Sequence, residues 1–135
     1  MIKLIVGIKG SGKRKHLIEL VNDSAKNTNG NIVCVEKGNK LTFDLQHSVR
    51  LVDVNNYGVA GYDAFYGFLA GLLAGNYDIT EIYVDSVIKI GDADLDRLAA
   101  FTEKVDALTA ESGVKVVLMV TAAEADLPES MKKYL

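Results

Sequence analysis

The strongest candidate for a binding or catalytic motif in this sequence is one glycine-rich stretch, Gly7-Ile8-Lys9-Gly10-Ser11-Gly12-Lys13. Glycine adopts the tight backbone angles that such a loop needs, and it lets backbone N–H groups come close to a ligand. Lysine adds a mobile positive charge. Both features suit a phosphate group, whose oxygen atoms accept hydrogen bonds. The residues that we expect to hold phosphate are Gly7, Lys9, Gly10, Ser11, Gly12, Lys13 and the adjoining Arg14.

Two elements must position this loop. The apolar run Ile2–Val6 predicts a buried strand, and apolar residues recur at helical spacing from Leu17 to Ala25. A helix directs its unpaired N–H groups and the positive end of its dipole toward the segment before it. A phosphate in the loop would therefore face both the loop N–H groups and the helix.

The loop resembles the P-loop (Walker A) pattern G-x-x-x-x-G-K-S/T at Gly7, Gly12 and Lys13, but Arg14 occupies the final position. In P-loop NTPases the Ser or Thr hydroxyl at that position binds Mg²⁺, which bridges the outer phosphates. Arginine cannot coordinate a cation, although it can contact phosphate directly. The resemblance thus implies that ATP or ADP is the ligand, while Arg14 argues against Mg²⁺ and against hydrolysis.

Asp85 is the candidate for a second motif, because it directly follows the apolar residues Ile82–Val84. This arrangement looks like the Walker B pattern, in which a strand-ending carboxylate organises Mg²⁺. Asp53 follows a similar apolar run and is the alternative. We favour Asp85 as the metal-linked acid and expect it to act with Lys13 in any catalysis.

Hydrolysis also requires a group that activates water. Many ATP hydrolases of the superfamily carry a glutamate directly after the Walker B aspartate, but this chain has Ser86 there. Serine is a poor base without a partner. Glu81 or Glu124 could take this role if the fold brought one of them to the loop.

Composition predicts one globular domain over residues 1–135, with 49% hydrophobic residues, 24% charged residues and one proline. The net charge of −3 gives no overall basic surface for nucleic acid. Positive charge is nevertheless concentrated at the glycine-rich loop, through Lys9, Lys13, Arg14 and Lys15. Cys34 is alone in an apolar run and predicts a buried strand residue. No apolar stretch reaches membrane-spanning length, so we expect a cytoplasmic protein without membrane insertion.

Strand and helix patterns alternate along the chain, which favours an α/β three-layer sandwich with a mainly parallel sheet. The segment Glu36–Leu45 contains a turn followed by alternating apolar and polar residues, and predicts a small β-hairpin added to that sheet. Small residues between the apolar positions of the helix from Gly61 to Gly75 predict that this helix is deeply buried. A long helix should begin at Asp92 or Asp94. The predicted strands after the first are Ile32–Val35, Val49–Val54, Thr80–Asp85 and Val114–Val120.

Two further groups of residues have weaker functional signals. His16 and His47 have no Cys, Asp or Glu cluster around them at metal-site spacing, so we interpret both as surface residues. Several aromatic residues could stack on a base, yet their spacing favours packing in the core. They are Tyr57, Tyr62, Phe65 and Tyr66.

The chain as a whole resembles short bacterial proteins labelled as pilus-retraction (twitching motility)-like ATPases. The segments Val35–Gly38, Tyr62–Phe68 and Val84–Ser86 carry this likeness. The resemblance implies a minimal P-loop NTPase-like domain. Members of that group usually continue the loop with Thr, so Arg14 is a departure.

Three functions follow as hypotheses. The first is a nucleotide-binding P-loop domain that hydrolyses ATP slowly. The second is a non-catalytic module that holds a nucleotide or another phosphate ligand and acts through a protein partner or as a homo-oligomer, with Arg14 in place of the metal charge. The third, less favoured than these two, is a small-molecule kinase, for which the chain has no obvious lid. A nucleic-acid motor is weaker still, because the chain has no basic stripe and no second domain.

Overall fold

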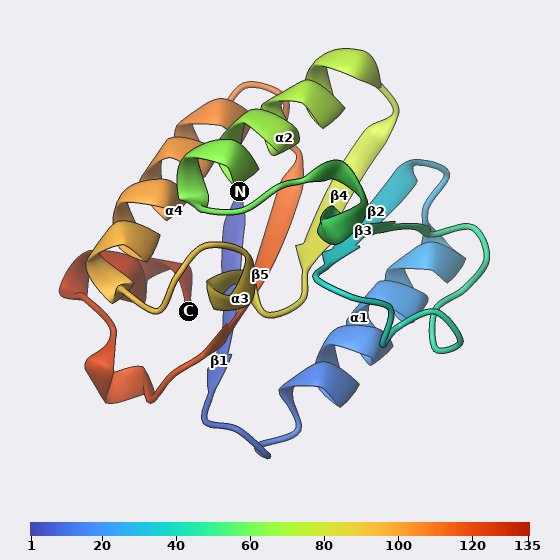
Figure 1. Ribbon diagram of the computed structural model, residues 1–135. Coiled ribbons are helices and arrows are strands. Elements are labelled where there is room, and N and C mark those ends of the chain that lie inside the picture. The colour runs from blue at the N-terminus through green and yellow to red at the C-terminus, as the bar shows by residue number, and fades with distance from the viewer.

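The computed structural model describes residues 1–135 as an α/β fold with a central sheet between two layers of helices (Figure 1). The sheet has five strands in the order β1-β5-β4-β2-β3. The strands are β1 Ile2–Gly7, β2 Asn31–Glu36, β3 Arg50–Asp53, β4 Ile79–Val84 and β5 Lys115–Thr121. The α-helices are α1 Lys13–Asn27, α2 Tyr62–Gly75, α3 Val87–Ile90 and α4 Leu95–Thr109. Short 3-10 helices lie at Val54–Tyr57, between β3 and α2, and after β5 at Glu124–Asp126 and Glu129–Tyr134.

All neighbouring strands run parallel, so their carboxyl ends meet at one edge of the sheet. β1 lies at one side of the sheet and pairs only with β5, in a register that places Gly7 opposite Thr121. β5 separates β1 from β4. The loop after β1 and the residues after β4 therefore lie at the same edge, with one strand between them.

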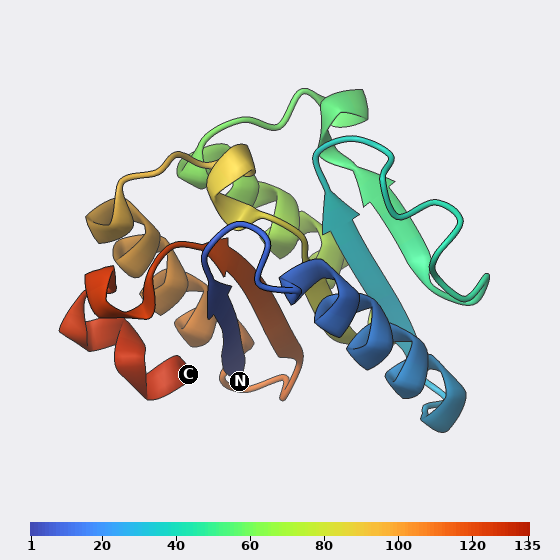
Figure 2. The same ribbon diagram turned by 90° about the horizontal axis from the view of Figure 1, so that it is seen from below.

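Helices cover the sheet on both faces, as Figures 1 and 2 show. Helix α1 packs over one face, where Leu17 and Val21 join a cluster of ten buried residues. Helices α2 and α4 lie side by side over the other face, where a larger cluster of 24 buried residues includes Phe65 and Phe101. The chain moves along the sheet in one direction through α1 and returns through α2 and α4. Right-handed crossovers require this change of face when the direction reverses.

The predicted hairpin at Glu36–Leu45 is wrong, because the sheet is wholly parallel and residues 37–49 form turns. Its apolar and polar alternation has another cause. Leu41 is fully buried under α1, and the Glu36 carboxylate accepts hydrogen bonds from the backbone N–H groups of Lys40 at 2.9 Å and Leu41 at 3.3 Å. These bonds turn the chain inward and occupy N–H groups that an antiparallel partner would need.

Helix α2 is less buried than its sequence predicts. Only Phe65 and Leu69 are buried, while Ala64, Gly67 and Gly71 face solvent. The helix packs on one side alone, so the small residues form its outer surface. No helix of the structure has both the length and the apolar character that crossing a membrane requires.

Helix α4 begins as the sequence predicts. The Asp94 side chain accepts hydrogen bonds from the N–H groups of Asp96 and Arg97, which makes it the N-cap. Two buried threonines on this helix, Thr102 and Thr109, donate their hydroxyls to backbone carbonyls one turn earlier, so neither hydroxyl is left unpaired.

Candidate functional site

The glycine-rich loop joins β1 to α1 and depends on its glycines. Gly10 and Gly12 have φ angles of 83° and 88°, in the left-handed region that side-chain-bearing residues avoid. Gly7 is needed for a different reason, because a Cβ there would collide with Oγ of Ser11. The loop is therefore a tight turn whose backbone stays accessible.

The start of α1 is open to an anion. Gly12 occupies the N-cap position and provides no side-chain hydrogen bond, and the first turn contains no acidic residue. The first N–H groups of a helix have no partner within the helix. The Lys13 ammonium bends back and donates to the backbone carbonyl of Ile8 at 2.8 Å, so it lies over the loop.

Asp85 reaches this site and Asp53 does not. The Oδ2 atom of Asp85 lies 3.3 Å from Nη2 of Arg14, and the Asp85 side chain is only 4% exposed. Its other oxygen, Oδ1, accepts a hydrogen bond from Oγ of Ser86 at 3.2 Å. Asp53 is engaged elsewhere, because its carboxylate accepts the N–H groups of Gly38 and Asn55, each at 2.9 Å.

Ser86 has an unusual backbone. It is the one residue other than glycine with a positive φ angle, 56°, and it is buried directly after Asp85. Such strain costs about 1–3 kcal/mol and is concentrated at functional sites. The strained turn places Ser86 beside the loop and directs the following helix, α3, toward the same pocket.

A pocket of about 460 Å³ lies beside the loop at the carboxyl edge of the sheet. Half of its lining is cationic and none of it is acidic, because Asp85 is buried beneath Arg14. Ile88 and Met119 are its only hydrophobic lining residues. The cationic residues of the lining are Lys9, Lys13, Arg14, Lys15, Lys40 and Lys89, and the others include Gly10, Gly12, Ser86 and Thr121.

Lys40 and Lys89 belong to this pocket but carry no motif in the sequence. Lys40 lies in the loop after β2, and Lys89 lies in α3, which follows β4. The positive charge of Lys40 lowers the pKa of Lys89, with smaller contributions from partial burial and from Arg14. Their positions in the sequence could have identified them as site residues. Both follow the ends of buried strands, and binding sites of parallel sheets form at the carboxyl ends of the strands.

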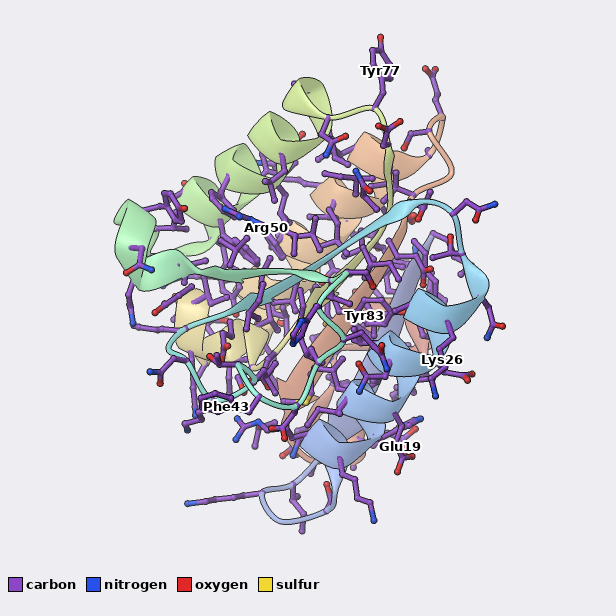
Figure 3. The ribbon with its side chains drawn as sticks, turned by 90° about the vertical axis from the view of Figure 1, so that its right-hand side faces the viewer. Glu19, Lys26, Phe43, Arg50, Tyr77 and Tyr83 are labelled. Atoms are coloured by element: carbon purple, nitrogen blue, oxygen red, sulfur yellow. The ribbon has the colours of Figure 1, made fainter.

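The two glutamates considered for water activation lie away from the pocket. Glu81 accepts hydrogen bonds from the Tyr83 hydroxyl at 2.6 Å and the Ser24 hydroxyl at 2.9 Å. Figure 3 labels Tyr83, which lies between the sheet and α1. Glu124 is exposed and lines a different groove, beside β1, together with His16.

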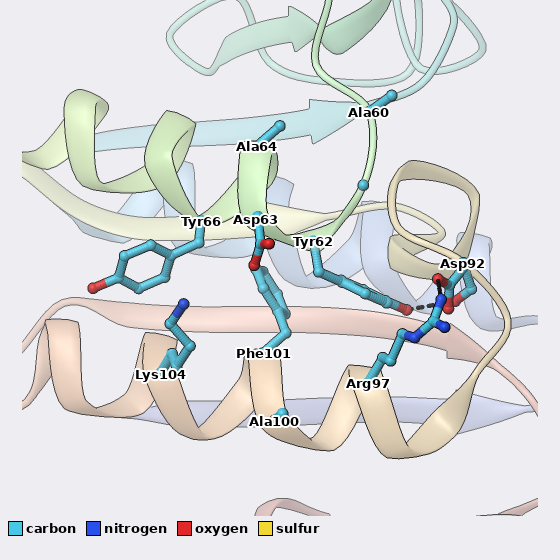
Figure 4. A pocket seen from close by; sticks show the side chains of 11 residues that line it. Ala60, Tyr62, Asp63, Ala64, Tyr66, Asp92, Arg97, Ala100, Phe101 and Lys104 are labelled. Carbon is cyan, nitrogen blue, oxygen red and sulfur yellow. Dashed lines mark hydrogen bonds and ion pairs between the residues drawn. The ribbon is translucent and has the colours of Figure 1, made fainter.

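A second hollow, of about 510 Å³, lies between α2 and α4 and shares no residue with the cationic pocket (Figure 4). The Tyr62 hydroxyl donates to the carbonyl of Asp92, whose carboxylate pairs with Arg97 at 2.8 Å. The Lys104 ammonium lies 4.6 Å from the centre of the Tyr66 ring. These polar and charged groups are paired with one another. The aromatic residues of α2 therefore contribute to packing in this hollow.

The remaining sequence candidates fall outside the pocket. His16 and His47 are exposed, and Cys34 is fully buried in β2, where burial raises its pKa. No group of three or more His, Cys, Asp or Glu side chains lies together as a metal site would require. The structure thus concentrates cationic groups at the loop, with one buried carboxylate among them.

Comparison with known proteins adds no relative. No protein-family model matches the chain, and no curated protein is significantly similar to it. The likeness to P-loop proteins stays a prediction from the sequence.

Proposed function

We propose that this chain binds the phosphate groups of a nucleotide, ATP or ADP, in the pocket beside Gly7–Lys13, and that it does so without a metal ion. The observation that carries this proposal is the cationic pocket itself. Six basic side chains and the N-terminus of α1 converge there, and the lining contains no carboxylate to neutralise them. Such an arrangement attracts an anion, which relieves the repulsion between the positive charges.

Arg14 takes the place of the metal in this proposal. Its guanidinium already pairs with the buried carboxylate of Asp85, and no group of three or more His, Cys, Asp or Glu side chains lies together there. Mg²⁺ at a phosphate site keeps several waters and uses only one or two protein oxygen atoms. Here the Arg14 guanidinium pairs with Asp85 and stands where the hydroxyl ligand would be, so its positive charge opposes a magnesium ion. Arg14 can instead hold Asp85 with one edge of the guanidinium and turn its remaining N–H groups toward a phosphate oxygen.

The same geometry favours holding a nucleotide over hydrolysing it. Ser86 donates its hydroxyl to Asp85, and neither Glu81 nor Glu124 lines the pocket. A water molecule beside the outer phosphate would lack a carboxylate base. We therefore infer a binding module, consistent with the minimal P-loop domain that the resemblance implies, acting as a structural or regulatory element.

Calorimetric titration of ATP and ADP, in magnesium and in EDTA, tests this function. The native chain should bind both nucleotides with similar affinity in the two buffers, and Lys13→Ala should abolish binding. Lys26→Ala is the matched control, because Lys26 is exposed on the outer face of α1, away from the pocket (Figure 3). Unchanged affinity in Lys13→Ala, or binding only in magnesium, would overturn the proposal.

A further inference from the structure

Two lysines from separate segments, Lys40 and Lys89, line the pocket together with residues of the glycine-rich loop. Their ammonium groups are close enough for the charge of Lys40 to lower the pKa of Lys89. No salt bridge with a carboxylate neutralises either of them. Both side chains are exposed, so neither lysine is needed to pack the hydrophobic core.

The segments that carry these lysines are held in place. The Glu36 carboxylate, which is buried at the end of β2, accepts the backbone N–H of Lys40 at 2.9 Å. The Lys37 ammonium donates to the backbone carbonyl of Lys89 at 3.3 Å and so ties the loop after β2 to α3. The two lysines are thus presented by a fixed backbone, as a binding subsite requires.

The strand order separates this pair from the glycine-rich loop. β4 lies two strands from β1 and β2 lies three strands away. At about 4.8 Å per strand, these offsets correspond to roughly 10 and 14 Å. Lys40 and Lys89 reach from these strands into the same pocket as Lys13 and Arg14. A chain of linked phosphates matches this separation better than a single phosphate in the loop does.

We propose that Lys40 and Lys89 form a second phosphate subsite, so that the ligand carries at least two linked phosphate groups, one at Gly7–Lys13 and the next at the lysine pair. This inference rests on the proposed function and deepens it. Two kinds of ligand carry such a di- or triphosphate group: a nucleotide and an inorganic polyphosphate.

The test compares phosphate chains of increasing length by calorimetry in EDTA. Orthophosphate, pyrophosphate, triphosphate, ADP and ATP are titrated into the native chain, Lys40→Ala, Lys89→Ala and the double variant, with Lys26→Ala as control. Each single substitution should weaken pyrophosphate binding roughly 5- to 20-fold, as loss of one charge-assisted hydrogen bond to a partly exposed lysine does. Orthophosphate affinity should stay within about twofold, because a single phosphate needs only the loop.

Thermal unfolding without ligand separates binding from structural support. Removing either lysine relieves the repulsion between like charges, so the midpoint temperature of thermal unfolding should stay constant or rise. A lower midpoint in both single variants would show that the lysines support the fold, and it would overturn the subsite.

The remaining outcomes distinguish this inference from the proposed function. If no phosphate compound binds the native chain, the proposed function itself fails. If Lys13→Ala abolishes binding but the double lysine variant binds pyrophosphate like the native chain, only the second subsite is overturned. With the subsite present, ATP binding much tighter than triphosphate identifies a nucleotide ligand, and equal affinities identify an inorganic polyphosphate.

Discussion

The guanidinium of Arg14 pairs with the buried carboxylate of Asp85, with 3.3 Å between Nη2 and Oδ2. Arg14 stands where the Walker A pattern has a hydroxyl residue, and Asp85 stands where the Walker B pattern has its acid. The two positions that would share a magnesium ion thus contact each other directly. The Arg14 Nε atom is buried and has no acceptor among the protein atoms, which shows that the guanidinium is held in this place at some cost.

Replacing Arg14 should change how binding depends on metal. Arg14→Thr frees the Asp85 carboxylate and supplies the hydroxyl that the Walker A pattern requires. We expect this variant to bind ATP more tightly in magnesium than in EDTA, by about tenfold or 1.4 kcal/mol. Calorimetry in both buffers measures the effect, and Arg14→Ala, which frees Asp85 without adding a hydroxyl, is the control. Equal affinities in the two buffers would show that this position does not decide metal use.

The ion pair should also be visible in stability. Arg14→Ala leaves the Asp85 carboxylate buried without a counter-charge, which should lower the free energy of unfolding by about 1–2 kcal/mol, since Arg14 is partly exposed to solvent. Adding Asp85→Asn to that variant removes the unpaired charge and should recover most of the loss. Urea unfolding of the two single variants and the double variant gives the coupling energy. Strictly additive losses would mean that the pair contributes nothing.

A side chain at Gly7 should displace the Ser11 hydroxyl from its present position. A Cβ at residue 7 would collide with Oγ of Ser11 and lie 3.3 Å from Cγ of Lys13. Gly7→Ala should therefore lower the free energy of unfolding by about 1–3 kcal/mol and weaken ATP binding. Ser11→Ala removes the colliding atom, so the double variant should regain stability relative to Gly7→Ala. If the second substitution has no effect, the loop does not adopt this conformation.

Glu36 should make stability depend on pH. Burial raises the pKa of its carboxyl, the N–H groups of Leu41 and Lys40 oppose this effect, and the charges of Asp85 and Asp53 raise the pKa further. Between the ordinary value of 4.5 and the raised value, the folded chain keeps a proton that the unfolded chain has released. Stability therefore falls as the pH rises through that window and increases on acidification.

Comparison with Glu36→Gln isolates this titration. The free energy of unfolding of the native chain, relative to that of the variant, should increase as the pH is lowered from about 7 to about 4. Urea denaturation at several pH values measures the difference. A relative stability that instead decreases on acidification would show that the two N–H donors outweigh burial.

Much of the fold could be predicted because the relevant signals are local. Alternation of strand and helix patterns depends on residues a few positions apart, and it correctly indicated an α/β fold with a parallel sheet. Asp94 was a correct helix start for the same reason, since its side chain caps N–H groups two and three residues ahead. The hairpin prediction was wrong because the alternation around Leu41 reflects the burial of a single turn, which the Glu36 carboxylate holds in place.

Local sequence patterns were enough to place a glycine-rich loop between the first strand and a helix, and Asp85 directly after a buried strand. Which groups meet at the loop follows from the arrangement of the whole fold. The order β1-β5-β4-β2-β3 brings Asp85 to Arg14, turns Asp53 to a separate loop, and gathers Lys40 and Lys89 at the pocket. Strand order follows from how whole faces of helices and strands are buried, so it depends on residues far apart in the chain.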